Sequence, residues 1–282
     1  MKILHINDFT RPDYMNDIVF HGGKKTFGDG YETTSPANYM YSDWLPHKQS
    51  LYGRGFTLYC RLDRPRFEPE EAEIVEKIRS RFYDRVIFGA AHRWQLHIDL
   101  VSRHYSRSEV AFIDGEDEND IAWPATEVGV YFKRELPAHH GALLPIGFGV
   151  PREIFRRDVP KTQILAATIP NFKKEYAFTD ETEYHMEYAR SSIAITTRKQ
   201  GWDALRHYEI VANFCMPHFP RLESCPVSTL CHFPKIEVAR YISSFGISVS
   251  ECWLEVMESV WSRCLENCTT EAVFGYVMGK LG

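Results

Sequence analysis

The stretch SSIAITTRKQGWDALRHYEIVANFCMPHF, residues 191–219, contains a strand, a helix and a second strand in succession. The apolar run at 193–197 predicts the first strand, the periodic apolar positions of 201–214 predict the helix, and 216–219 predicts a short second strand. Two strands joined through a helix pair in parallel, and the helix packs on one face of their sheet. This unit therefore indicates an α/β fold with parallel sheets.

The same alternation of strands and helices continues on both sides of this unit. Residues 21–55, rich in Gly, Tyr, Ser and Pro, show no helical period and are predicted to form long loops, which are often functional. The helix that follows 178 has Thr179 or Asp180 as its predicted cap. The further predicted strands are 2–8, 56–62, 85–90, 109–120 (running into an acidic turn), 128–136 and 162–169, and the further helices are 68–82, 92–105, 179–192 and those within 235–280.

Residues 137–161 are rich in proline and glycine and separate two series of strands and helices. This break predicts two Rossmann-like domains, an N-terminal one at 1–145 and a C-terminal one at 146–282 that ends in a helical tail. Their parallel sheets are expected to face a central cleft, because ligands of such sheets bind beyond the carboxyl ends of the strands.

Composition excludes several classes of protein. The 282 residues are 44% hydrophobic, which is enough for a large core, and the net charge of −5 disfavours a nucleic-acid-binding protein. No apolar run reaches the roughly 18 residues of a membrane helix, and the first residues meet Asp8 too early for a secretory leader, so a soluble cytoplasmic protein is expected. The seven cysteines are odd in number and scattered, which predicts reduced thiols.

The turn between the strand and the helix of 191–219 is the first candidate binding site. Arg198 lies in a basic turn and Gly201 is expected to open the helix, whose N-terminal N–H groups favour an anion such as phosphate. Trp202, Arg206, Glu209 and Asn213 follow at helical spacing and would share one stripe. In that stripe a guanidinium suits a diphosphate and a carboxylate suits ribose hydroxyls. The alternative is that Arg206 and Glu209 form a plain surface ion pair.

The segment 201–219 resembles the nucleotide-sugar-binding segment of exostosin-type glycosyltransferases. That family has a Gly-aromatic-acid turn, then an Arg, a Glu three residues later, and a small-residue segment that ends in Cys-x-Pro. Phe214 departs from the pattern, because the family usually has glycine there. The matching positions are Gly201, Trp202, Asp203, Arg206, Glu209, Cys215 and Pro217.

Three further strings are similar to the small exostosin-like transferases of large algal viruses and related bacterial enzymes. They are FIDGEDE at 112–118, YFKREL at 131–136 and PIGFG at 145–149. The resemblance spans about the last two thirds of the chain and is weaker before residue 108.

The resemblance implies a GT-B fold and an inverting transferase without a bound metal or other cofactor. The co-substrate would be a nucleotide sugar, UDP-xylose as the best guess, held by the C-terminal domain. The acceptor would be an oligosaccharide or the glycan of a glycoprotein, and a viral protein would act in the host cytoplasm. Arg134 would help to hold the diphosphate.

Inversion requires a general base that removes the proton of the acceptor hydroxyl. The base is expected from the N-terminal half, where the candidates are Asp8 after the first strand, Asp114 and Asp117 in the acidic turn, and Glu32 in the long loop. Each of these acids is also a plausible solvated turn residue.

Three alternatives remain open at this point. The turn DGEDE at 114–118 could hold Mg²⁺ or Mn²⁺ in a metal-dependent GT-A type transferase. A zinc site could be built from cysteines and histidines, although their spacing is not typical. The chain could also be a non-catalytic glycan- or nucleotide-binding module. The zinc candidates are Cys215, His218, Cys225, Cys231 and His232.

Overall fold

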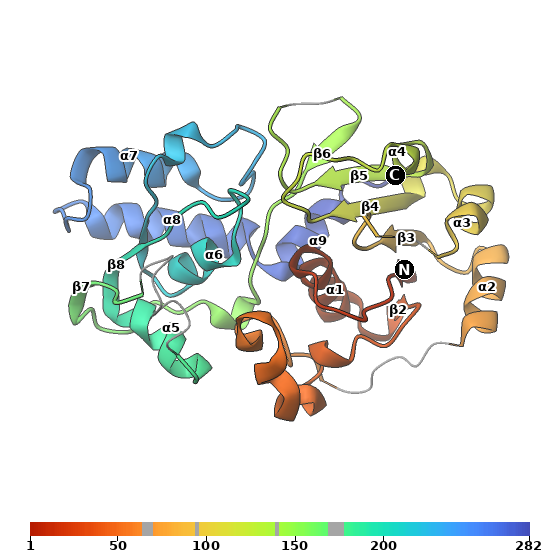
Figure 1. Cartoon of the computed structure of the whole chain (residues 1–282), viewed down its shortest axis with the longest axis horizontal. Coiled ribbons are helices and arrows are strands. Elements are labelled where there is room, and N and C mark those ends of the chain that lie inside the picture. Colours follow the sequence, from red (N-terminus) through yellow and green to blue (C-terminus); the bar gives the residue numbers. More distant parts are fainter. Residues whose placement is uncertain (64–69, 94–95, 139–140, 169–177) are drawn as a thin grey trace.

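The computed structural model describes residues 1–63, 70–93, 96–138, 141–168 and 178–282. The chain forms a mixed α/β fold with a six-stranded sheet and a three-stranded sheet, and every strand pair in both sheets is parallel (Figure 1). The α/β class and the parallel pairing predicted from the sequence are confirmed.

The larger sheet contains strands from the first half of the chain. In β1 residue Ile3 lies opposite Tyr31 of one neighbour and Arg85 of the other. The chain therefore changes direction across the sheet between β1 and β3, which is the place where doubly wound sheets bind ligands. Across the sheet the strands are β2 (Tyr31–Thr33), β1 (Ile3–Ile6), β3 (Arg85–Phe88), β4 (Val110–Asp114), β5 (Val130–Lys133) and β6 (Leu143–Pro145).

Alternate residues of these strands are buried on opposite faces of the sheet. Ile3, Ile87 and Phe132 belong to the cluster that includes α1, whereas Leu4 and Phe88 belong to the cluster that includes α2 and α3. Burial on both faces explains why the strands are almost continuously apolar. The covering helices are α1 (Tyr14–Phe27), α2 (Glu71–Arg79), α3 (Ile98–His104), α4 (Trp123–Val128) and, from the end of the chain, α9 (Thr270–Met278).

The smaller sheet is built by the unit that the sequence singled out. Its strands are β7 (Gln163–Leu165), β8 (Ser191–Ile195) and β9 (Met216–His218), with β8 in the centre. Asp180 caps the helix before β8 by accepting from the backbone N–H of Glu183 at 2.9 Å, as predicted. The helices of this part are α5 (Glu181–Arg190), α6 (Leu205–Ala212), α7 (Lys235–Phe245) and α8 (Trp253–Asn267).

Two chain segments connect the sheets and lie against each other. Val150 follows β6, and its N–H donates to the carbonyl of Cys268 at 2.9 Å, while the N–H of Thr270 donates back to Val150 at 3.1 Å. Helix α9 then packs on α1, beneath the larger sheet (Figure 1). The tail of the C-terminal series thus returns to the N-terminal one, and one apolar cluster contains residues of both sheets.

Two predictions for the first 62 residues are wrong. The segment 21–55 holds the end of α1, strand β2 and the 3-10 helices η2 (Asn38–Met40), η3 (Ser42–Ser50) and η4 (Tyr52–Gly55) rather than long loops. The segment 56–62 is a set of turns with a bridge from Tyr41 to Leu62 instead of a strand. Its alternating pattern is broken by left-handed backbone at Thr57 and Cys60, which have φ of 74° and 61°.

Helix α1 was not predicted from the sequence, because it contains glycines, which disfavour helices. These glycines are explained by the packing of the helix. A Cβ on Gly22 would lie 2.1 Å from the carbonyl oxygen of Thr270, and a Cβ on Gly23 would lie 2.3 Å from the ring of Tyr31. The backbone of α9 therefore approaches α1 where a side chain would otherwise stand.

We predict that Gly22→Ala destabilises the fold although alanine favours helices. Overpacking at this backbone contact should lower the free energy of unfolding by about 1–3 kcal/mol. The matched control is Gly275→Ala in α9, because a Cβ there meets nothing within 4 Å. The control should gain about 0.5–1 kcal/mol from helix propensity. Urea unfolding of both variants is the measurement, and equal shifts would contradict the proposed close approach.

Candidate functional site

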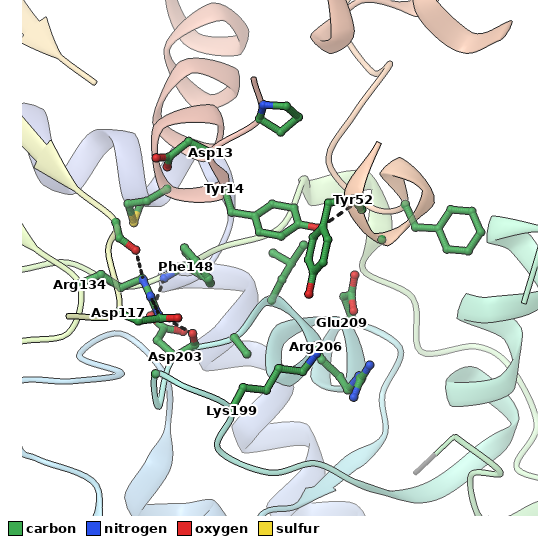
Figure 2. A pocket seen from close by; sticks show the side chains of 18 of the residues that line it. Asp13, Tyr14, Tyr52, Asp117, Arg134, Phe148, Lys199, Asp203, Arg206 and Glu209 are labelled. Carbon is green, nitrogen blue, oxygen red and sulfur yellow. Dashed lines mark hydrogen bonds and ion pairs between the residues drawn. The ribbon is translucent and has the colours of Figure 1, made fainter. Parts of the chain in front are cut away.

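A cavity of about 470 Å³ lies where the carboxyl ends of the two sheets face each other. Its first wall comes from the segments that follow the six strands of the larger sheet, and its second wall comes from the segment after β8 and from α6. Figure 2 shows the pocket between the start of α1, which carries Asp13 and Tyr14, and the segment that carries Lys199, Asp203 and Arg206.

The second wall carries two positive charges, and Arg206 is the one of them that the sequence analysis named. Lys199 and Arg206 both line the cavity, the first from the turn after β8 and the second from the first turn of α6. The helix, however, begins at Leu205, so Gly201 does not open it and Trp202 precedes it. The expected stripe therefore reduces to Arg206 and Glu209 within the cavity.

The other members of the expected stripe lie elsewhere. Asn213 is the C-cap of α6 and is buried, where its amide contacts Nδ1 of His185 at 2.9 Å. Trp202 packs on Phe219 with ring centroids 5.9 Å apart, and the guanidinium of Arg198 lies 5.2 Å from the Trp202 ring. Neither Arg198 nor Trp202 is among the residues that line the cavity.

Glu209 is a buried carboxylate that accepts hydrogen bonds from two hydroxyl groups. Tyr184 donates to Oε2 at 2.6 Å, and the Thr57 hydroxyl donates to Oε1. Burial raises the pKa of Glu209, while both hydroxyls and the nearby Arg206 act in the opposite direction. Thr57 is itself anchored, because its N–H donates to Glu181 at 2.7 Å. A carboxylate in this setting recognises hydroxyl donors rather than a fixed cation.

Arg134 is buried at the join of the two walls. Its guanidinium donates to Glu135 at 2.9 Å, to Asp117 and, at 2.5 Å, to the backbone carbonyl of Asp203. The same group lies 4.7 Å from the ring of Phe148. The sequence suggested that Arg134 binds a diphosphate, but these partners already satisfy its charge.

Gly201 and Asp203 complete this join. A Cβ on Gly201 would lie 2.4 Å from Oδ1 of Asp117 and 2.6 Å from Oε1 of Glu135, so a side chain here would have to displace the two carboxylates that bind Arg134. Oδ2 of Asp203 accepts from the N–H of Phe148 at 2.9 Å. Burial raises the pKa of Asp203 to about 7 against the opposing charge of Arg134.

Of the four acids expected to act as a base, Asp117 alone lines the cavity. Asp114 is buried and accepts from the Tyr131 hydroxyl at 2.6 Å and from Lys133 at 3.0 Å.

The two remaining acids also lie outside the cavity lining. Glu32 is held by Lys77 at 2.9 Å and by the Tyr83 hydroxyl at 2.7 Å. Asp8 is exposed and lies 3.8 Å from Arg93.

The structure adds a polar cluster that the sequence did not reveal. Nε2 of His92 lies 2.7 Å from Oε1 of Glu116 and 3.7 Å from Oδ2 of Asp13. Asp13 also caps α1 by accepting from the N–H of Asn16 at 3.1 Å. The three residues follow β1, β3 and β4, so only the strand order brings them together. The sequence signals were the acidic turn DGEDE, which contains Glu116, and the Pro-Asp pair before α1, which is typical of a helix start.

Among the described residues, Asp13, His92 and Glu116 are the one group of three that could hold a metal ion. Asp114 and Asp117 of the acidic turn do not join it, because Lys133 and Arg134 pair with them. The five cysteine and histidine candidates for zinc form no such group within the described ranges. All seven cysteines are free thiols.

The cavity also has an aromatic side. Tyr14, Tyr52, Phe148 and Tyr184 line it, and the ring of Tyr14 stands 6.0 Å from Tyr52 and 6.2 Å from Phe148. Flat apolar rings beside a few polar groups are typical of small-molecule sites.

Phe214 adopts the left-handed backbone that glycine would take. Its φ is 54°, and its ring packs against Trp253 and Trp261 with centroids 5.9 Å and 6.2 Å away. Phe214 therefore takes a backbone conformation that favours glycine, and its ring makes an apolar contact with two tryptophans.

Comparisons of the chain with models of protein families, with curated proteins and with solved structures each found no significant match. Across the described residues, no helix combines the length and the apolar character needed to span a bilayer.

We predict a pH-dependent gain in stability for Asp203→Asn. The pKa of this carboxyl rises from 3.8 to about 7 on folding, so the folded chain binds the proton more tightly than the unfolded chain. The wild type is therefore progressively destabilised as the pH rises from about 4 to about 7, and the variant lacks this loss. Urea unfolding at several pH values should show the difference growing by a few kcal/mol in the variant's favour, whereas a constant difference would contradict the raised pKa.

Proposed function

We propose that the protein is an inverting, nucleotide-sugar-dependent glycosyltransferase with the two-domain GT-B arrangement. The observation that supports this best is one cavity between the carboxyl ends of two parallel sheets, with Lys199, Arg206 and a hydroxyl-binding carboxylate on one wall and with acids, arginines and aromatic rings on the other. The domains would be 1–145 and 146–282, with α9 of the second returning to the first.

The donor would lie on the second wall. Lys199 and Arg206 would bind the two phosphates, where positive charge stabilises the leaving group as the sugar–phosphate bond breaks. Glu209 would bind the ribose: it already accepts from the hydroxyls of Thr57 and Tyr184, and a ribose hydroxyl would replace the former. Arg134 and Asp203 would position this wall rather than contact the donor.

The acceptor would lie on the first wall, where Tyr14, Tyr52 and Phe148 offer flat surfaces to the apolar faces of sugar rings. A xylose moved from UDP-xylose to a hydroxyl of an oligosaccharide or glycoprotein glycan remains our proposal for the reaction. That choice of sugar rests on the resemblance to the viral transferases and on no contact in the cavity.

Two other functions are less well supported. A GT-A type metal site built from Asp114 and Asp117 is disfavoured, because these acids pair with Lys133 and Arg134. A non-catalytic binding module would have the same donor wall. Incubation with a panel of nucleotide sugars distinguishes a transferase from a binding module, since only an enzyme hydrolyses or transfers the sugar.

We predict that Arg206→Lys lowers kcat by about 10²-fold while KM for the donor changes less. The reason is that lysine lacks the planar guanidinium that would stabilise the negative charge developing on the leaving diphosphate. The matched control is Arg198→Lys, an exposed arginine outside the cavity, whose kcat should stay within about 2-fold of wild type. Steady-state kinetics with the donor identified by the panel is the measurement. Equal effects of the two variants would remove Arg206 from the donor site.

Activity should persist in excess EDTA. Lys199 and Arg206 would supply the positive charge that a divalent cation supplies in a metal-dependent transferase, so the ion would be redundant. The measurement is transfer by protein dialysed against EDTA, with and without added Mn²⁺. Activity that is lost in EDTA and restored by Mn²⁺ would favour the metal-dependent alternative.

A further inference from the structure

The cavity holds five carboxyl groups within the described residues, and four of them have fixed partners. This inference rests on the proposed transferase function, which requires one of them to accept the proton of the acceptor hydroxyl. The five are Asp13, Glu116, Asp117, Asp203 and Glu209.

Glu209 and Asp203 belong to the second wall and are almost wholly buried, with exposures of 6% and 3%. Glu209 is held by two hydroxyls, and Asp203 by the backbone N–H of Phe148. The pKa of Asp203, about 7, would suit a base, but an acceptor hydroxyl cannot approach an oxygen so enclosed.

The remaining acids lie on the first wall. Asp117 pairs with the buried guanidinium of Arg134, so its carboxylate already has a charged partner. Asp13 has a side chain that is 9% exposed, caps a helix N-terminus and lies 3.5 Å from Arg93. Glu116 differs from both, because its side chain is 44% exposed and the group beside it is the imidazole of His92, with Nε2 at 2.7 Å from Oε1.

We propose that Glu116 is the general base of the transfer and that His92 is the residue that positions it. The loop after β4 carries Glu116 to the carboxyl end of the larger sheet, next to the change of strand direction between β1 and β3. Nε2 of His92 lies 2.7 Å from Oε1 of Glu116 and would hold that oxygen, and Oδ2 of Asp13 lies 3.7 Å from the same nitrogen. The other oxygen is left for the acceptor.

The step balances without any further reactant. The acceptor O–H bond breaks and its proton passes to Glu116, while the acceptor oxygen forms a bond to the anomeric carbon. The bond from that carbon to the phosphate oxygen breaks, and its electron pair leaves with the nucleoside diphosphate beside Lys199 and Arg206. The exposed Glu116 then releases the proton to solvent.

The first test compares Glu116→Gln with Glu118→Gln in the full-length protein. Glu118 lies in the same loop, is exposed and contacts Gln200 outside the cavity. Glu116→Gln should lower kcat by about 10²–10⁴-fold with an unchanged Kd for UDP measured by calorimetry, whereas Glu118→Gln should keep wild-type kcat. Wild-type kcat in Glu116→Gln would overturn the proposal.

The second test concerns His92. Because a positioning role needs an N–H donor, His92→Gln should keep more kcat than His92→Leu, with similar KM for the donor in both. Equal losses in the two variants would overturn that role.

The outcomes separate this proposal from the function on which it rests. A wild type that neither transfers nor hydrolyses any nucleotide sugar overturns both. An active wild type whose kcat falls in Asp203→Asn or Asp13→Asn but not in Glu116→Gln overturns the base alone. Activity that requires Mn²⁺ or Zn²⁺ and loses that metal in Glu116→Gln would make the residue a ligand and also overturns its role as base.

Discussion

The buried guanidinium of Arg134 is the interaction on which the rest of the structure depends. It joins the end of the larger sheet to the segment after β8, because it donates to Asp117 and Glu135 on one side and to the carbonyl of Asp203 on the other. A charge buried this deeply is tolerated only when all its partners are in place, and removing one side of such a cluster costs about 3–5 kcal/mol. The cluster therefore fixes how the carboxyl ends of the two sheets face each other.

This constraint decides which charges in the cavity can serve a ligand. Arg134 and Asp117 neutralise each other, and Gly201 is small because Asp117 and Glu135 occupy the space beside it. The residues proposed to contact a ligand therefore lie farther along the walls. They are Lys199 and Arg206 on one side and Glu116 on the other. Some of the residues at the positions of the exostosin motif therefore hold the walls together, and others face the cavity.

The sequence predicted the local elements well where one physical rule dominated. The acid-capped helix after Asp180 and the strand–helix–strand unit around β8 follow from capping and periodicity, and both formed. Helix α1 was not predicted, because the reason for Gly22 is the close approach of the α9 backbone. Helix α9 lies about 250 positions later in the chain, so this contact cannot be inferred from the local sequence pattern. The cluster of Glu116 with His92 and Asp13 was not predicted for the same reason, since these neighbours follow other strands.

A second charged cluster closes the opposite edge of the cavity. Glu181 at the start of α5 pairs with Lys48 and Arg61 and accepts from the N–H of Thr57 at 2.7 Å, so the segment from η3 onward is held against the smaller sheet. These cations and the Thr57 N–H lower the pKa of Glu181 in spite of its burial. The Arg134 cluster and the Glu181 cluster thus bracket the cavity. Because the hydroxyl of Thr57 also donates to Glu209, the Glu181 cluster is linked through this one residue to the buried carboxylate of the cavity.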